Sequence, residues 1–327
     1  MKETIIIKTD GNNEIGLGHI YRSLNLAKEL KKNNLKIVFL TKSPIVKKII
    51  PKIFTIKKIN NNTKELQNFL NKLNPKIVII DKLKENSNEL KILDRKSNVV
   101  GIDYTAKNKK ILKFGINMLY QKSGIHGKNC FSGFNLTILS DPIKNTNPIK
   151  ISKKVKKILV IQGGSDTPCN TPLIIDSLNE VYENIQINVI VGASFECWKK
   201  LKESMDNSIH PVKLFHDVKN IGEIMKKNDM AITGGGMTSL ELCHLGIPSI
   251  IICGASFENE TSLLLEKNGF GINLGYNKKI SKEKIAVKIK DLILDYKKRK
   301  KMNKIGQKLI DGKGTKRVSK IIVSMIK

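Results

Sequence analysis

Short apolar runs alternate with helical patterns along the whole of this 327-residue chain. In its first part, runs rich in Ile and Val predict strands, and apolar residues at helical spacing predict helices between them. The predicted strands span 4–8, 36–40, 53–56, 77–80, 99–102 and 116–119, and the predicted helices span 20–31, 45–50, 63–73 and 85–94. Continuous apolar strands separated by helices are typical of a parallel sheet that is covered on both faces.

The pattern breaks near residue 140 and then starts again. Asp141-Pro142 and Asn147-Pro148, followed by lysines up to Lys157, indicate an exposed connection. Beyond it we predict strands at 158–161, 187–191, 212–215, 230–232 and 250–253, helices at 173–182, 196–205, 221–227, 238–245 and 258–267, and a helical tail over 282–327 with a glycine break at 311–314. We therefore predict an α/β protein with two Rossmann-like parallel-sheet domains, 1–140 and 157–327, joined by a linker at 141–156. A ligand cleft between the carboxyl ends of the two sets of strands is expected.

Composition is that of a soluble globular protein, with 40% hydrophobic and 27% charged residues. No apolar run approaches the roughly 20 residues that a membrane span needs, and the first residues lead into a strand without the apolar region of a signal peptide. We therefore expect a cytoplasmic protein without stable membrane insertion. The five cysteines are widely spaced and form no C-x-x-C, so we expect buried thiols, with neither a zinc site nor a disulfide framework.

The formal net charge of +30 invites a nucleic-acid partner. However, the lysines are spread over the whole chain, and aromatic residues make up only 5% of it. Arginine occurs only at Arg22, Arg95, Arg299 and Arg317. Nucleic-acid readers usually cluster arginine or carry aromatic stacking platforms. We therefore predict a solvated lysine surface and no nucleic-acid partner, and leave open an attraction to anionic substrates or a peripheral contact with an acidic membrane.

The stretch 10–27, DGNNEIGLGHIYRSLNLA, is the first candidate site. A strand, a loop with Gly16 and Gly18, and a helix start form a geometry that brings backbone N–H groups onto a phosphate or carboxylate. His19 follows the second glycine directly, where an imidazole can act as general base near a bound sugar phosphate.

Two aspartates, Asp81 and Asp103, follow apolar strands of the same domain. Either can orient His19 or a water molecule, or simply start a turn. The other histidines show no metal-ligand spacing with one another, so no metal site is predicted.

The second domain carries glycines after two of its strands. One group is Gly163, Gly164 and Ser165, and the other is the run Gly234, Gly235, Gly236, Met237, Thr238, which continues to Glu241. Glycines between a strand and a helix let the backbone approach a pyrophosphate at the positive end of the helix. Thr238 can donate a hydroxyl there or cap the helix, and Glu241 can accept both ribose hydroxyls. The alternative is an ordinary glycine turn before a capped helix.

Together these motifs resemble the nucleotide-sugar enzymes of the GT-B superfamily. The run 234–241 is similar to the nucleotide-sugar signature of the glycosyltransferase that makes lipid II. The first stretch, I-G-x-G-H-x-x-R-S-L-x-L-A, is closer to the hydrolases of UDP-2,4-diacetamido-2,4,6-trideoxy-β-L-altropyranose in pseudaminic acid synthesis and to their spore-coat-polysaccharide relatives. The segments 133–135, 163–166 and 259–262 fit the same branch, so the resemblance extends from the first strand to about Gly275.

The resemblance implies a GT-B-like fold and a hydrolysis without metal or cofactor, in which water attacks the anomeric carbon and UDP leaves. The free amino sugar then goes on to a nonulosonic acid or a surface polysaccharide. His19 is the implied general base. The implied substrate contacts are Gly16, Gly18, Arg22, Asp81, Asn259, Glu260 and Thr261, and the implied UDP contacts are Gly163, Gly164, Ser165, Gly234, Gly235, Gly236, Met237, Thr238 and Glu241.

Two of these assignments have alternatives. Arg22 can equally pair with a neighbour on the helix surface, and Asn259 can be an ordinary helix cap. After Asp81 the family usually has a His-Tyr or similar polar-aromatic pair, whereas this chain has Lys82 and Leu83. This departure leaves the sugar open, and a relative that acts on another UDP-sugar fits equally well.

The alternative function is that of a GT-B glycosyltransferase, in which His19 deprotonates an acceptor hydroxyl in place of water. In both cases the expected partner is a small UDP-sugar. The sequence does not predict the oligomeric state.

Overall fold

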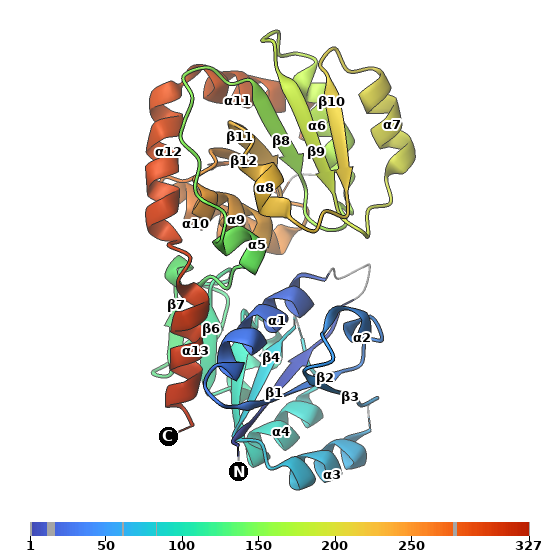
Figure 1. The fold of residues 1–327 in the computed structure, drawn as a ribbon, viewed down its shortest axis with the longest axis vertical. Helices are drawn as coiled ribbons and strands as arrows, with labels where there is room; N and C mark the ends of the chain where they lie inside the picture. The colour runs from blue at the N-terminus through green and yellow to red at the C-terminus, as the bar shows by residue number, and fades with distance from the viewer. Residues whose placement is uncertain (1, 12–16, 61, 83, 277–279, 327) are drawn as a thin grey trace. The chain divides into compact units, whose positions relative to one another are not determined.

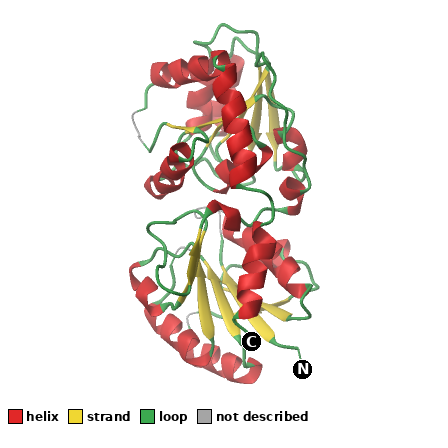
Figure 2. Cartoon of the chain, turned by 90° about the vertical axis from the view of Figure 1, so that its left-hand side faces the viewer, coloured by secondary structure: helices red, strands yellow, loops and turns green. Residues whose placement is uncertain are grey.

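A computed structural model describes residues 2–11, 17–60, 62–82, 84–276 and 280–326 of the chain. The chain divides into two compact units. Unit 1 comprises Met1–Ser140 and Gly312–Lys327, and unit 2 comprises Asp141–Asp311. Each unit is built on a parallel sheet flanked by helices, as Figures 1 and 2 show.

The described strands of unit 1 form one seven-stranded sheet in the order β3-β2-β1-β4-β5-β6-β7. Their bounds are β1 Thr4–Thr9, β2 Lys36–Thr41, β3 Thr55–Lys58, β4 Ile77–Asp81, β5 Asn98–Ile102, β6 Phe114–Asn117 and β7 Cys130–Ser132. The strands predicted at 4–8, 36–40, 77–80 and 99–102 are confirmed, whereas those predicted at 53–56 and 116–119 are each displaced by two residues from β3 and β6. Ile5, Ile6 and Ile7 of β1 and Ile77–Ile80 of β4 are fully buried. Two-sided cover by helices explains why these strands do not alternate with polar residues.

The helices of unit 1 that the structure describes are α1 Gly18–Lys31, α2 Val46–Ile49, α3 Thr63–Leu73, α4 Ser87–Lys96, the 3-10 helices η1 Lys107–Ile111 and η2 Phe134–Leu136, and α13 Gly314–Ser324. Asn62 and Asn86 start α3 and α4 as side-chain N-caps, because their oxygens accept the orphan amides of the first turn. By contrast, α1 starts after Leu17 without a side-chain cap, and Ile20, Ala27 and Leu30 anchor it to the sheet.

In unit 2 the described strands form a six-stranded parallel sheet in the order β10-β9-β8-β11-β12-β13. Their bounds are β8 Lys157–Ile161, β9 Gln186–Val191, β10 Val212–His216, β11 Met230–Thr233, β12 Ser249–Ile251 and β13 Ile272–Asn273. The described helices are α5 Asp141–Lys144, α6 Asn170–Leu178, α7 Trp198–Asp206, α8 Ile221–Met225, α9 Met237–Leu245, η3 Ser256–Glu258, α10 Asn259–Lys267, α11 Lys282–Leu294 and α12 Tyr296–Leu309.

In each sheet the strand order reverses at one pair of neighbouring strands, because the chain first adds strands on one side of the first strand and then on the other. In unit 1 this pair is β1 and β4, and in unit 2 it is β8 and β11. The crevice outside the carboxyl ends of such strands is the usual ligand position of an open α/β sheet. The topology therefore points to the loops after these four strands.

The structure corrects the predicted assignment of the last residues to the second domain. Helix α13 lies against α1 and η2 of unit 1, where Val318 and Ile322 are fully buried (Figure 1). Arg317 Nη1 donates to the Asn135 carbonyl at 3.0 Å. The amphipathic pattern predicted the helix correctly, but an apolar face does not specify which sheet will cover it.

The predicted linker also belongs to a unit. Residues 141–156 lie within unit 2, where Ile143 and Val155 are buried and the amide of Ile149 donates to the Leu245 carbonyl at 2.9 Å. Arg299, fully buried in α12, donates to the carbonyls of Ser152 and Lys153. The Pro- and Lys-rich composition indicated exposure, but the backbone of this segment is fixed to α9 and α12.

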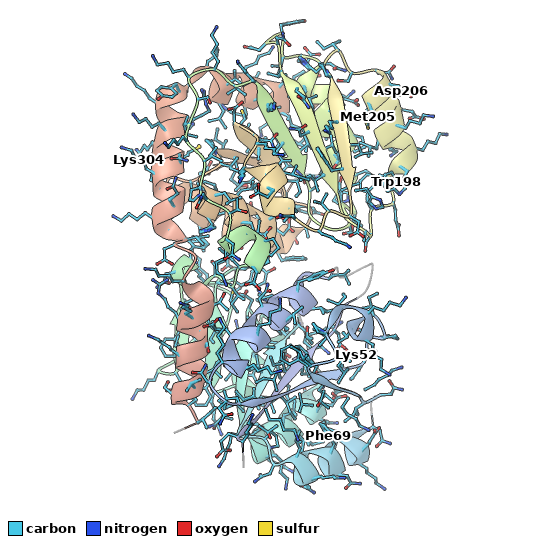
Figure 3. All side chains as sticks on the ribbon, in the orientation of Figure 1. Lys52, Phe69, Trp198, Met205, Asp206 and Lys304 are labelled. Carbon is cyan, nitrogen blue, oxygen red and sulfur yellow. A yellow bond between two sulfur atoms is a disulfide. The ribbon has the colours of Figure 1, made fainter. Side chains whose placement is uncertain are left out.

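Lysine side chains project from the outer faces of both units. Lys304 on the outer face of α12 and Lys52 after α2 are examples (Figure 3), and both are exposed. Phe69 on α3, by contrast, packs against the apolar cluster of unit 1 that contains Leu66 and Leu70.

Candidate functional site

His19 lies beside the strand pair β1 and β4, at which the strand order of the unit 1 sheet reverses. It is the second residue of α1, which follows β1, and its Nδ1 lies 2.8 Å from Oδ1 of Asp81, the last residue of β4. The register of the sheet pairs Asp81 with Thr9, the last residue of β1. The predicted pairing of His19 with a strand-end aspartate is therefore present, and Asp81 rather than Asp103 makes it.

Asp81 fixes the ring orientation of His19. The carboxylate is fully buried, and burial alone would raise the pKa of Asp81. The Arg22 charge and the hydrogen bonds from His19 and Arg22 outweigh burial and lower the pKa of Asp81 from 3.8 to about 2. An ionised carboxylate only accepts hydrogen bonds, so Nδ1–H of His19 is the donor and Nε2 of the neutral ring is left as the basic atom. No hydrogen bond from the described residues reaches that Nε2, and the side chain is 15% exposed.

Arg22 contacts both members of this pair, and its Nη2 lies 3.4 Å from His19 Nδ1. Its side chain is 3% exposed, and it donates through Nε and Nη2 to Asp81 at 3.1 and 2.5 Å and through Nη1 to Asp103 at 2.5 Å. The two carboxylates raise the pKa of Arg22 further, although burial opposes this. The guanidinium thus bonds to strand-end carboxylates in the interior. This is not the surface pairing considered for Arg22, and the substrate contact stays a prediction.

Asp10 fixes the start of the loop that leads to His19. Its Oδ1 accepts from the Lys42 amide at 2.7 Å and from Thr41 Oγ1 at 2.9 Å, and its Oδ2 accepts from Lys82 Nζ at 2.5 Å. Burial would raise the pKa of Asp10, but these contacts, led by the Lys82 charge, lower it to about 2. Lys82 Nζ also forms an ion pair with Glu85 Oε2 at 3.3 Å. Sequence reasoning noted Lys82 only as a departure from a family pattern, and its structural role was missed.

Two glycines of the predicted site, Gly16 and Gly18, precede His19. Gly16 and Leu83 lie outside the described residues. At Gly18, a Cβ would meet no atom within 4 Å, and the backbone is not in the left-handed region. Neither packing nor conformation therefore requires glycine at this position. The predicted contact of Gly18 with a ligand stays a prediction.

In unit 2, the glycine run after β11 is held by Glu258. Its Oε2 accepts from the amides of Gly235 at 3.2 Å and Gly254 at 2.8 Å, and so joins the loops after β11 and β12. Burial raises the pKa of Glu258, although these amide bonds oppose the shift. A Cβ on Gly235 would lie 2.5 Å from Ser262 Oγ and 3.0 Å from Cys253 Sγ. Gly235 is thus required for packing, and its amide is already used.

The start of α9 is the more open part of the run. Gly234 and Gly235 are buried, whereas Gly236, Met237 and Thr238 are partly exposed. No side chain caps this helix, so Thr238 does not have the capping role considered for it. Amides at an uncapped helix start, with the positive end of the helix dipole, suit an anion.

Glu241 lies one turn further along α9 and is partly buried. Among the described residues, no hydrogen bond or ion pair reaches its carboxylate. Burial raises the pKa of Glu241 from 4.5 to about 7. Because no described residue bonds them, the oxygens of this carboxyl group can accept hydrogen bonds from a ligand.

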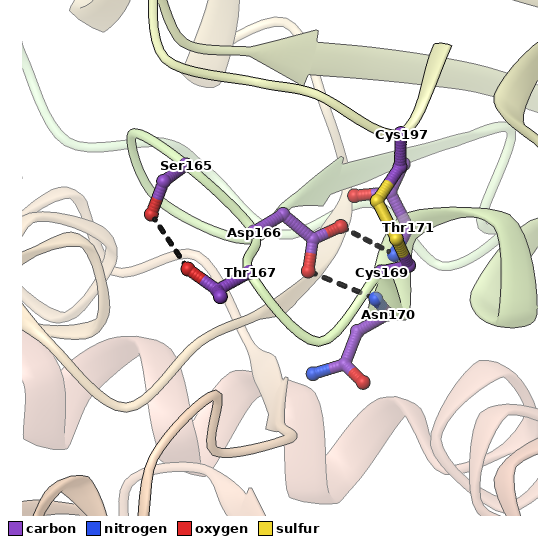
Figure 4. The surroundings of a disulfide bond; sticks show 7 residues. All are labelled: Ser165, Asp166, Thr167, Cys169, Asn170, Thr171 and Cys197. Carbon is purple, nitrogen blue, oxygen red and sulfur yellow. Dashed lines mark hydrogen bonds between the residues drawn. A yellow bond between two sulfur atoms is a disulfide. The ribbon is translucent and has the colours of Figure 1, made fainter. Parts of the chain in front are cut away.

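The loop after β8 holds Gly163, Gly164 and Ser165, and Figure 4 shows it from Ser165 onward. Gly163 has φ +83°, which favours glycine, whereas a Cβ on Gly164 would meet no atom within 4 Å. Asp166 accepts from the amides of Asn170 and Thr171, both at 2.8 Å, and so caps the start of α6.

Cys169 and Cys197 form a disulfide that joins this loop to the segment before α7 (Figure 4). This corrects the expectation that the cysteines are unpaired thiols. The loops are also in close backbone contact, because a Cβ on Gly192 would lie 2.5 Å from the Gly164 carbonyl oxygen. The two cysteines are 28 residues apart, and only the meeting of the loops after β8 and β9 shows that they pair.

The polar stretch after β12 begins α10. Asn259 is the first residue of this helix rather than its cap, and its Oδ1 accepts from Asn273 Nδ2 at 3.1 Å. Glu260 is partly exposed, whereas Thr261 is fully buried. Asn259 and Glu260 are therefore accessible at the helix start, and Thr261 is not.

No cluster of three or more His, Cys, Asp or Glu side chains with a metal-binding arrangement occurs among the described residues. None of the described helices is long and apolar enough to cross a membrane.

Comparison with known structures identifies the architecture. MurG of Acinetobacter baumannii superposes with a TM-score of 0.74 over 99% of this chain and 100% of that one, at 11% sequence identity. The fold is of the GT-B type. UDP-GlcNAc 2-epimerase from Neisseria meningitidis, bound to UDP-GlcNAc, gives a TM-score of 0.67 at 13% identity and covers 99% of this chain and 100% of its own. At these identities the likeness concerns the fold alone.

Sequence comparison adds a family match that extends from β8 into α13 of this GT-B-type chain. Residues 158–318 match the Glycosyltransferase family 28 C-terminal domain. The uncharacterized protein MJ1062 of Methanocaldococcus jannaschii is 31% identical over 85% of this chain and 59% of its own length. The spore coat polysaccharide biosynthesis protein SpsG of Bacillus subtilis is 22% identical over 53% of this chain and 51% of its own length. The chain thus spans between half and three-fifths of these relatives.

Proposed function

We propose that this chain cleaves UDP from a UDP-linked acetamido sugar, with water as the nucleophile. The observation that carries the proposal is the His19–Asp81 pair between the ends of β1 and β4, which leaves His19 Nε2 as a basic atom. The partly exposed start of α9 and the Glu241 carboxylate in unit 2 support the nucleotide half of the proposal.

In the proposed reaction, His19 Nε2 takes a proton from water as the water oxygen bonds to the anomeric carbon. The bond between that carbon and the diphosphate oxygen breaks, and UDP leaves with the electron pair. Asp81 stabilises the imidazolium that forms. The amides at the start of α9 stabilise the charge that develops on the diphosphate. Glu241 accepts from the ribose hydroxyls, and Asn259 and Glu260 are the sugar contacts.

A second candidate is transfer of the sugar to an acceptor hydroxyl by the same base. The match of residues 158–318 to a glycosyltransferase domain favours it. The spore coat polysaccharide relative is compatible with both candidates, since its name gives a biosynthetic role without a reaction.

The deciding experiment measures UDP release from a panel of UDP-sugars in ¹⁸O-labelled water, with and without sugar acceptors. We expect release without an acceptor and the label in the free sugar, because attack is at carbon. His19→Ala should lower the rate by about 10²- to 10⁴-fold, the usual contribution of a general base, and leave UDP affinity unchanged. Exposed His126 of the same unit provides the matched control, and His126→Ala should retain the wild-type rate.

Two results would contradict the hydrolase proposal. UDP release that strictly requires an acceptor would favour the transferase candidate. Normal turnover by the His19 variant would remove its role as base in both candidates.

A further inference from the structure

Behind His19 stands a row of three buried charged side chains. Asp81 bonds His19, Arg22 bonds Asp81 and also lies with its Nη2 3.4 Å from His19 Nδ1, and Asp103 bonds Arg22. Asp81 and Asp103 are fully buried and Arg22 is 3% exposed. The three groups come from the ends of β4 and β5 and from the first turns of α1.

Three backbone amides donate hydrogen bonds to the carboxylate of Asp103. Its Oδ1 accepts from the amides of Met118 and Leu119 at 2.8 and 2.9 Å, and from Tyr120 at 3.4 Å. Its backbone adopts a left-handed conformation with φ +48°. All three amides donate to the carboxylate, and an ionised carboxylate only accepts hydrogen bonds. The segment after β6 thereby fixes Asp103, which in turn fixes the guanidinium of Arg22.

The formal charges of the row do not cancel. Asp81 and Asp103 contribute two negative charges and Arg22 one positive charge, so one negative charge remains behind the imidazole. When His19 gains a proton, the cluster becomes neutral. Without the Asp103 charge, Arg22 and Asp81 would form a neutral pair, and the imidazolium would lose its net counter-charge. Charge inside a low-dielectric interior acts strongly over such distances.

We propose that Asp103 is a positioning residue for His19 that supplies, through Arg22, the net negative charge that stabilises the protonated imidazole. The inference rests on the proposed function in that His19 is the base. It gives Arg22 a task inside the protein, through its bonds to Asp81 and Asp103. The charged and titratable groups around His19 are Arg22 on α1, Asp81 on β4, Asp103 after β5 and Tyr120 after β6, whose phenol interacts electrostatically with Arg22. Lys82, next to Asp81 in the chain, bonds Asp10 instead.

The test is Asp103→Asn, which keeps an oxygen for the amides of Met118 and Leu119 and a residue type that tolerates positive φ. Removing the charge disfavours the imidazolium. The acidic limb of the pH profile of kcat/KM should therefore move to lower pH, and kcat should fall about tenfold or more while KM stays within about threefold. The control is Asp94→Asn, which removes a partly exposed aspartate of α4 and should leave both unchanged.

A double variant, Arg22→Met with Asp103→Asn, separates charge from disruption. It changes more of the structure, but Asp81 again leaves one negative charge behind His19. Its acidic limb should therefore lie closer to that of the wild type than the limb of the single variant does. An unshifted limb in Asp103→Asn, or a shift in the double variant at least as large as in the single one, would overturn the proposal.

NMR of the His19 ring gives a readout that does not depend on turnover. The pH at which the ring signals shift should follow the same order, lowest in Asp103→Asn. If no UDP-sugar is cleaved by the wild type, the proposed function fails, and the ring titration still decides the role of Asp103. If cleavage is normal and the ring titrates alike in all variants, the inference fails and the proposed function stands.

Discussion

At the scale of single residues, Glu241 and His19 are opposite cases of a buried acid-base group. His19 has a charged partner in Asp81, whereas no described residue bonds the Glu241 carboxylate. Burial without a partner penalises the ionised form and raises the pKa of Glu241 to about 7. A ligand with hydroxyl groups at this position would supply the missing donors and favour ionisation.

This predicts a pH-dependent affinity for a UDP-sugar. Ionised Glu241 accepts from ribose hydroxyls, so binding should weaken as the pH falls through about 7 and Glu241 becomes protonated, by up to about tenfold per pH unit. UDP-N-acetylglucosamine is the suitable probe, because its diphosphate diester does not titrate in this range. Calorimetric titration from pH 5.5 to 8 measures the effect, and Glu241→Gln should bind weakly with little pH dependence.

The ligand-free protein should show the opposite trend. Because the folded pKa of Glu241 lies above its unfolded value, its contribution to stability is present below pH 4.5 and is lost as the pH rises through about 7. An unchanged pH dependence of binding in Glu241→Gln would show that the carboxylate does not contact the ligand.

Arg22 marks the limit of prediction at this scale. The sequence placed it one turn after His19 on a helix, which is compatible with a substrate contact or a surface pair. Its burial depends on Asp81 and Asp103, which come from two other strands. The spacing along the helix predicts that His19 and Arg22 are neighbours, but it does not predict whether the Arg22 side chain points to solvent or into the protein.

At the scale of elements, two glycines of unit 2 illustrate two different constraints. A Cβ on Gly164 would meet open space. On Gly306 in α12 it would collide with the Cys243 carbonyl of α9 and with the Phe270 ring. One glycine therefore leaves room beside a loop, and the other lets two helices touch.

We predict opposite effects for the two alanine variants. Gly164→Ala should leave the free energy of unfolding nearly unchanged and weaken UDP binding, because the methyl group occupies space meant for ligand. Gly306→Ala should lower the free energy of unfolding by about 1–3 kcal/mol, the usual cost of overpacking, despite the better helix propensity of alanine. Denaturant unfolding and UDP titration of both variants measure this, and normal UDP affinity in Gly164→Ala would remove that loop from the nucleotide site.

The long elements were predictable and the short ones were not. Apolar runs such as those of β1, β4 and β8 are long enough to indicate buried strands, and the sheet follows from their alternation with helices. β7 and β13 have only three and two residues, and residues 131 and 132 of β7 are exposed, so no run marks them. The break between α11 and α12 at Asp295 was missed, because neither glycine nor proline marks it and the residues on both sides are helical.

At the scale of the whole molecule, α13 decides which segments make up unit 1. Ile322 on this helix is fully buried, whereas its neighbour Ile321 is partly exposed. The pair thus separates the face that packs on unit 1 from the face beside it.

Ile322→Ala should lower the free energy of unfolding of unit 1 by about 2–4 kcal/mol, because it leaves a cavity beneath the helix. Ile321→Ala is the matched control and should cost clearly less. UDP affinity, which we assign to unit 2, should be unchanged in both. Denaturant unfolding read at unit 1 and UDP titration check this, and equal losses in the two variants would mean that α13 does not pack as described.

The placement of α13 also bears on how the molecule is made. Unit 2 is one continuous stretch, Asp141–Asp311, whereas unit 1 needs residues from both sides of it. During synthesis the ribosome delivers all of unit 2 before the last helix of unit 1 emerges. The usual order, in which the N-terminal domain is finished first, is therefore reversed. Unit 1, which holds His19, must wait with the α1 surface uncovered until unit 2 has been translated.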